Sequence, residues 1–201
     1  MSTLNGGGNS PAVSYFRVLG SLLYNEPSAE AIDMLIDEKV LSVLPYASDN
    51  ERALKGQKEL LEWLESSPRE DLTLEARTEY MRLLIGIGKS LAPPWGSTYL
   101  NDDRLLFTEE TLKVRFFYEK YGMKLKEKYS EPDDHIGLEL EFLAYLLERG
   151  EREAACTFAA QFLVPWISRW NADMQKHSKT GYYKGLGNMA LGGIDFFISA
   201  R

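Results

Sequence analysis

The 201-residue chain has one cysteine, Cys156, and two histidines, His135 and His177. A single cysteine cannot form an internal disulfide or build a cysteine-based zinc site. No apolar run reaches the roughly 20 residues that a membrane-spanning helix needs. The first residues also lack the basic and apolar regions of a signal peptide. These absences predict a cytoplasmic protein with a reduced thiol and no stable membrane insertion.

An excess of basic residues is also missing. The chain has 23 Lys and Arg against 30 Asp and Glu, which gives a formal net charge of −7. General nucleic-acid binding needs a basic surface that neutralises phosphates, so we expect no nucleic-acid partner. The acidity either aids solubility or favours a cationic partner.

Helical periodicity dominates the sequence, and strand-like alternation is scarce. It predicts an all-α fold, a single compact multi-helix domain over residues 13–201 after a flexible leader at 1–12, with a candidate hinge at 122–132. Pro165 lies inside the seventh predicted helix and predicts a kink near 161–162 or two consecutive helices there. The predicted helices are 13–25, 29–44, 49–66, 73–87, 108–121, 132–149, 151–175 and 180–200.

Regular patterning stops between residues 88 and 107, which include two prolines, two glycines and a tryptophan. A connection of about 20 residues without its own structure is usually functional or disordered. Large apolar side chains favour an ordered loop that packs on its own side chains. These side chains are Leu91, Trp95, Tyr99, Leu100, Leu105, Leu106 and Phe107.

A second unusual stretch is Ser130–Glu148. Pro132 suits the first position of a helix, and Asp133 and Asp134 suit its first turn, where the helix dipole favours negative charge. An apolar stripe at helical spacing follows, and polar side chains lie at its edge. The stripe is Ile136, Leu140, Leu143 and Leu147, and the polar side chains include His135, Glu139 and Glu141.

An enzyme is the alternative function that these residues suggest. Asp134, His135, Glu139 and Glu141 have side chains that bind metals, but a di-metal bundle needs a second Glu-x-x-His copy, which is absent. Gly88-Lys89-Ser90 resembles the end of a phosphate-binding loop, but Leu83 stands where that pattern requires glycine. A small metal- or nucleotide-dependent enzyme is therefore kept as the alternative. The favoured interpretation is a protein without catalytic residues, metal or cofactor.

Peptide binding is the hypothesis that best uses both stretches. Trp95 lies between Pro94 and Gly96, so its indole is held on a rigid turn and suits an apolar anchor. Aspartates could pair with arginines of a peptide whose arginines precede an apolar stretch. In the other interpretation Trp95 packs its loop onto the core and the aspartates cap helices, and composition does not separate the two. The aspartates are Asp102, Asp103, Asp133 and Asp134.

Two segments resemble the signature motifs of the TorD/DmsD family. They are residues 93–100, PPWGSTYL, and residues 131–142, EPDDHIGLELEF; residues 106–111 and 162–166 also fit. Members of this family are cytoplasmic maturation chaperones for molybdenum-cofactor redox enzymes. The resemblance extends from about Tyr15 to Phe197, and the first motif is closer to the DMSO-reductase branch than to the nitrate-reductase branch.

The resemblance implies an all-α chaperone that binds the twin-arginine signal peptide of a DMSO/TMAO-reductase-type precursor. Such a chaperone assists folding and cofactor loading before Tat export. Further implied partners are the Tat translocase or cofactor-biosynthesis proteins, and the implied state is a monomer or homodimer. A third reading, a purely structural interaction domain, would bind no signal peptide.

The family positions also imply a site. The loop around Trp95 and the start of the Asp134 helix would converge on one groove, in which apolar groups hold the peptide and carboxylates pair with its arginines. The implied peptide-binding residues are Pro94, Trp95, Gly96, Ser97, Tyr99, Asp133, Asp134 and His135, and the implied supporting residues are Pro132, Gly137 and Glu141.

Overall fold

The computed structural model describes residues 10–36, 40, 44–86, 90–123 and 131–200. Within these ranges the chain is helical, and its only extended pairing is an isolated β-bridge, so the predicted all-α fold is confirmed. The α-helices are α1 (Pro11–Tyr24), α2 (Ala29–Ile36), α4 (Glu51–Leu64), α5 (Arg69–Tyr80), α6 (Ser97–Leu100), α7 (Glu109–Lys120), α8 (Ile136–Glu148), α9 (Arg152–Phe158), α10 (Val164–His177) and α11 (Gly181–Ser199). A 3₁₀ turn (Leu44–Ala47) and two π-helical turns (Met81–Ile85 and Ala159–Leu163) complete the described elements.

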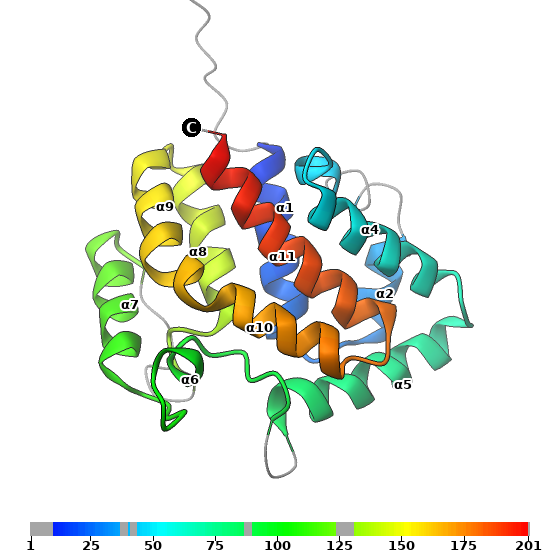
Figure 1. Cartoon of the computed structure of the whole chain (residues 1–201). Coiled ribbons are helices and arrows are strands. Elements are labelled where there is room, and N and C mark those ends of the chain that lie inside the picture. Colours follow the sequence, from blue (N-terminus) through cyan, green and yellow to red (C-terminus); the bar gives the residue numbers. More distant parts are fainter. Residues whose placement is uncertain (1–9, 37–39, 41–43, 87–89, 124–130, 201) are drawn as a thin grey trace, which may run out of the picture.

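Helix α11 crosses the middle of the molecule, with α4 on one side and α8 and α9 on the other (Figure 1). Its glycines allow close packing, because a Cβ atom at Gly185 would lie 2.7 Å from the carbonyl oxygen of Gly56 on α4. Helices α1 and α8 approach each other in the same way, since a Cβ atom at Gly137 would lie 2.8 Å from the Gly20 oxygen. Glycines on α11 and α8 thus let two pairs of helices approach at backbone distance.

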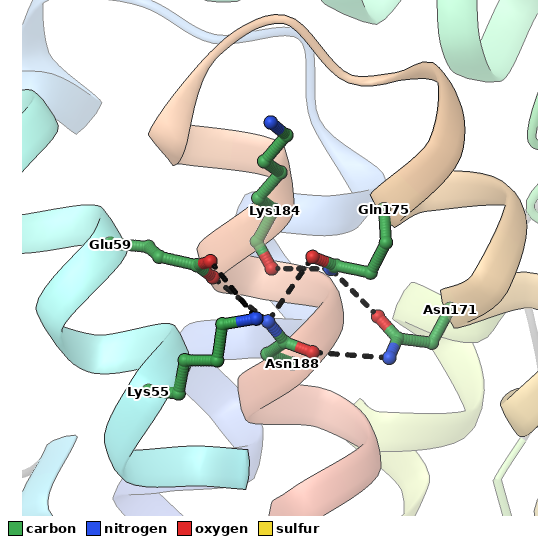
Figure 2. Close-up of polar contacts among 6 residues, drawn as sticks. All are labelled: Lys55, Glu59, Asn171, Gln175, Lys184 and Asn188. Carbon is green, nitrogen blue, oxygen red and sulfur yellow. Dashed lines mark hydrogen bonds and ion pairs between the residues drawn. The ribbon is translucent and has the colours of Figure 1, made fainter.

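A polar network lies where α4, α10 and α11 meet (Figure 2). The Asn188 amide, on α11, donates to Glu59 at 2.8 Å and to Gln175 at 3.3 Å, and its oxygen accepts from Asn171 at 3.2 Å. Gln175 also donates to the carbonyl oxygen of Lys184 at 2.9 Å. Buried amides are stable only when such partners exist, so the network fixes how these three helices pack.

Several predicted boundaries are corrected. Helix α1 begins at Pro11, so Pro11 and Ala12 belong to a helix rather than to the leader. The segment with Pro165 consists of consecutive helices joined by the π-helical turn, and Pro165 lies in the first turn of α10, where a missing N–H is tolerated. Residues 1–9 of the predicted leader, 124–130 of the predicted hinge and 88–89 of the Gly-Lys-Ser segment lie outside the described residues.

The start of α8 also differs from the prediction. It begins at Ile136 rather than at Pro132, and His135 is its N-cap. The residues before it form a turn in which the His135 N–H donates to the Pro132 oxygen at 3.3 Å. None of the described helices is long and apolar enough to cross a membrane.

Candidate functional site

The two unusual stretches of the sequence meet in the structure. Trp95 and His135 form an antiparallel β-bridge. The Gly96 N–H donates to the Asp134 carbonyl oxygen at 2.9 Å, and the Ile136 N–H donates to the Pro94 oxygen at 2.8 Å. The loop before α6 and the start of α8 are therefore one rigid unit, which we call the bridge.

The carboxylates of the bridge are turned inward. Asp134 is 2% exposed; its Oδ2 accepts from the Ser97 N–H at 2.5 Å and its Oδ1 accepts from the Thr111 hydroxyl at 2.8 Å. Asp133, also 2% exposed, accepts from Arg115 Nε at 2.8 Å. Both carboxylates are buried and already bonded within the chain, which matches the interpretation in which the aspartates serve the fold, and their pairing with a peptide's arginines stays a prediction.

His135 is likewise part of the interior. Its Nδ1 accepts from the Gly137 N–H at 3.0 Å, and its ring packs edge-on against Tyr24 and Trp95, with centroids 5.2 and 6.0 Å away. Burial lowers the pKa of His135 to about 3, so the imidazole is neutral near pH 7. It caps a helix and supplies no positive charge.

Glu139, one turn further along α8, is fully buried. Burial, and to a lesser extent the charge of Asp134, raises the pKa of Glu139 well above its usual value. The same burial disfavours the ionised carboxylate that metal binding needs. Among the described residues, no group of three or more His, Cys, Asp and Glu side chains is placed to hold a metal ion.

The loop of the bridge lies against α10. A Cβ atom at Gly96 would be 2.8 Å from Trp166 Nε1, so only glycine allows this approach. Tyr99 stacks on the same indole with ring centroids 5.7 Å apart. Pro94 and Ser97 are buried, whereas Trp95 is half-buried and its Nε1 donates to Glu131. Trp95 is thus the predicted site residue with the most direct access to solvent on this loop.

The predicted supporting residues surround the bridge from inside. Pro132 and Gly137 are buried, and Glu141 is half-buried, where burial raises its pKa. A Cβ atom at Gly137 would lie 2.7 Å from the Cβ of Tyr24, so this glycine permits α1 to pack beside the start of α8. Gly137 thus positions the start of α8 against α1, and the supporting roles of Pro132 and Glu141 stay predictions.

An exposed apolar surface lies beside the bridge, and the sequence reasoning did not identify it. The side chains of this surface are 40–63% exposed. The sequence predicts instead that Leu105, Leu106 and Phe107 pack within their loop. Phe107, Thr111, Leu112 and Arg115 line a pocket of about 370 Å³ within it. We use the name apolar surface for the five exposed apolar residues Leu105, Leu106, Phe107, Leu112 and Phe116.

The bridge holds this surface in place. Thr111 and Arg115, which line its pocket, are the residues that bond Asp134 and Asp133. Asp102 and Asp103, at the other end of the loop, are exposed and make no ion pair within the described ranges. A signal was present in the sequence: Leu112 and Phe116 are one turn apart on α7, away from the buried Val114 and Tyr118.

Comparison with known proteins shows the family to which the chain belongs. The profile of the family described as "Nitrate reductase delta subunit" matches residues 44–174, more than half of the chain. The chain therefore belongs to this family, which agrees with its resemblance to the TorD/DmsD chaperones.

Two named relatives and one solved structure are similar to the chain. It is 33% identical to a Tat proofreading chaperone DmsD of Salmonella paratyphi A over 111 residues, which cover 55% of this chain and about half (54%) of that relative. It is 28% identical to a chaperone protein TorD of Aliivibrio fischeri, with 82% of each chain covered. A crystal structure from Archaeoglobus fulgidus, described as a redox enzyme maturation protein, matches the chain with a TM-score of 0.57 and 18% identity. The match covers 95% of this chain and 98% of the other, and it supports the fold.

Proposed function

We propose that the chain is a cytoplasmic maturation chaperone that binds the twin-arginine signal peptide of a molybdenum-cofactor redox enzyme of the DMSO/TMAO-reductase type. It would hold the precursor while that enzyme folds and receives its cofactor before Tat export. The observation that carries the proposal is the apolar surface, which is exposed, pocketed and fixed to the bridge. The relatives named DmsD and TorD, which are described as chaperones, support it.

The chemistry of the surface fits such a peptide. Each Å² of apolar area that leaves water contributes about 25 cal/mol, so a peptide's apolar stretch gains by covering Phe107, Leu112 and Phe116. Asp102 and Asp103 lie at the end of the same loop and would attract the arginines before that stretch. The net charge of −7 favours approach of a cationic segment from a distance.

A chaperone needs no catalytic group, and the candidate groups have other roles. Asp134 is bonded to Ser97 and Thr111, His135 caps α8, and Glu139 is buried with a raised pKa. These contacts favour a non-enzymatic protein over the metal-dependent alternative.

Direct contacts with the Tat translocase or cofactor-biosynthesis proteins, and the choice between monomer and homodimer, stay predictions from the resemblance.

Isothermal titration calorimetry with a twin-arginine leader peptide tests this function. Replacing Phe116, 63% exposed, by serine removes apolar area that the peptide would cover, and we expect a Kd about tenfold higher. Leu74→Ser on α5 is the matched control, because Leu74 is 66% exposed and outside the surface. Equal Kd values for wild type, Phe116→Ser and Leu74→Ser would contradict the proposed site.

A further inference from the structure

A second pocket, of about 420 Å³, lies between the loop that follows α6 and α10. Tyr99 forms one wall, and its hydroxyl donates to Asp173 Oδ2 at 3.3 Å. Its ring is held in place by stacking on Trp166. Burial raises the pKa of Tyr99, so the phenol keeps its proton. The pocket thus combines a fixed aromatic face with the carboxylates of Asp173 and Asp102.

An arginine of the chain itself already lies in this pocket. The Arg104 guanidinium carbon is 5.8 Å from the centroid of the Tyr99 ring, within the range of a cation–π contact. Within the described ranges Arg104 makes no ion pair, so the Tyr99 ring is its contact in this pocket, whose lining it shares with Asp102 and Asp173. Its φ of 53° is in the left-handed region, which is unfavourable for a residue with a Cβ atom.

The charges of the pocket depend on this one side chain. Asp102 and Asp173 face Arg104 and Arg169, so the four formal charges cancel. Arg169 also has a partner outside the pocket, since its guanidinium donates to the Pro165 carbonyl oxygen at 3.2 Å. If Arg104 leaves, the lining keeps two carboxylates and one arginine, and it becomes attractive to another cation.

The loop from Arg104 to Phe107 joins the two pockets. Arg104 lines the polar pocket and Phe107 lines the apolar one, and Leu105 and Leu106 lie between them. Phe107, like Arg104, has a positive φ, of 55°. The order Arg-Leu-Leu-Phe is an arginine followed by apolar residues, which is the chemistry of the peptide proposed above. Three residues of extended chain span about 10 Å, so a bound peptide could reach both pockets in the same order.

We propose that Tyr99, Asp102 and Asp173 form a guanidinium-binding subsite for an arginine of the signal peptide, and that Arg104 occupies this subsite until the peptide displaces it. The inference rests on the proposed function and adds the place where one arginine binds. Arg104 then acts as an internal competitor: it neutralises the subsite in the free protein, and only a ligand that brings both an arginine and an apolar segment displaces it. Such a device would favour complete signal sequences over isolated cationic or apolar peptides.

Calorimetry on the full chain tests the competition. Removing an internal competitor raises the fraction of molecules that can bind, so Arg104→Ala should lower the Kd for a twin-arginine peptide roughly threefold to tenfold. Asp173→Asn keeps the shape but removes a charge, and should raise that Kd about tenfold. The same Asp173→Asn variant should leave the Kd of a peptide with both arginines replaced by alanine unchanged.

Matched variants exclude general effects of lost surface charge. Arg149 also lies over a tyrosine ring, 5.3 Å from Tyr145, but it follows α8 and does not line the pocket, so Arg149→Ala should leave the Kd unchanged. Asp49→Asn, in an exposed turn before α4, is the matched control for Asp173→Asn. The inference is supported if Arg104→Ala lowers the Kd and Arg149→Ala does not, and if Asp173→Asn raises the Kd and Asp49→Asn does not.

The outcomes separate this inference from the proposed function. If wild type binds the twin-arginine peptide and Arg104→Ala binds it with equal Kd, the subsite is overturned while the proposed function stands. A higher Kd with Arg104→Ala also overturns the subsite, since it would mean that Arg104 itself contacts the ligand. If wild type binds no twin-arginine peptide, both are overturned.

Discussion

Asp134 joins three segments of the chain. Its side chain accepts from the Ser97 N–H and the Thr111 hydroxyl, and its carbonyl oxygen accepts from the Gly96 N–H. These hydrogen bonds replace the hydration that the buried side chain loses. In this chain the acidic residues of the second signature segment therefore hold the bridge together, and the groups available to a peptide lie further along the loop.

Asp134→Ala should destabilise the protein. It leaves the buried Ser97 N–H and Thr111 hydroxyl without a partner, which we expect to lower the free energy of unfolding by about 3 kcal/mol. Urea denaturation followed by circular dichroism measures the change. Asp103→Ala, at an exposed position of the loop, should change that free energy by less than about 0.5 kcal/mol. Equal unfolding midpoints for the two variants would contradict this role.

His135 gives the stability a dependence on acid pH. Its folded-state pKa is lowered from 6.5 to about 3, so the unfolded chain takes up a proton on this residue below pH 6.5 and the folded chain does not. The stabilisation is therefore fully present above pH 6.5 and is lost as the pH falls toward 3. His135→Asn keeps an N-cap acceptor for the Gly137 N–H but does not titrate.

The measurement is the free energy of unfolding of wild type and His135→Asn at several pH values from 7.5 to about 4. We expect the advantage of wild type over the variant to shrink steadily as the pH is lowered. A difference that is constant over this range would show that His135 is accessible to protons in the folded state.

Among the elements, α4 and α11 form a close helix pair. At Gly185 a Cβ atom would lie 2.7 Å from a backbone oxygen of α4, and a backbone cannot move aside as a flexible side chain can. Gly185→Ala gains about 1 kcal/mol in helix propensity but forces the helices apart, which costs about 1–3 kcal/mol. We expect a net loss of about 1 kcal/mol in the free energy of unfolding. Lys184→Ala is the neighbouring control, and a more stable Gly185→Ala variant would contradict the close packing.

The helices could be predicted from the sequence because their apolar residues recur at helical spacing. The start of α8 could not, since Pro132, Asp133 and Asp134 satisfy every local rule for a first turn. What overrides those rules is tertiary: the backbone of Asp134 and Ile136 pairs with Gly96 and Pro94 instead of continuing a helix. The paired residues lie far apart in the sequence, so the residues around each of them do not indicate the pairing.

The exposure of the apolar surface could not be predicted from the sequence either. Leu105, Leu106 and Phe107 are large apolar residues, and such residues are usually buried, so the sequence predicted a self-packed loop. The structure leaves them about half exposed, and Phe107 adopts a positive φ. Exposed apolar groups on strained backbone indicate a binding surface, and only the structure shows that Phe107 and Leu112 line one pocket.

At the scale of the whole molecule, the predicted single helical domain and the family were correct, and the arrangement of the site was correct only in part. Trp95 and His135 do meet, as the two motifs suggested. The burial of Asp133 and Asp134 could not be predicted, because their partners Arg115 and Ser97 lie on other elements. The recognition surface that we propose is therefore the loop and α7, which the bridge supports.

The most direct test of this account is amide hydrogen–deuterium exchange on the whole chain, with and without a twin-arginine leader peptide. We expect the peptide to slow exchange in residues 97–120, which include α6, the loop and α7, and to leave α4 and α5 unchanged. A control peptide with alanine in place of both arginines should protect these residues less. Protection confined to α4, α5 or α11, or no protection at a peptide concentration that saturates binding, would contradict the central claim that the apolar surface binds the signal peptide.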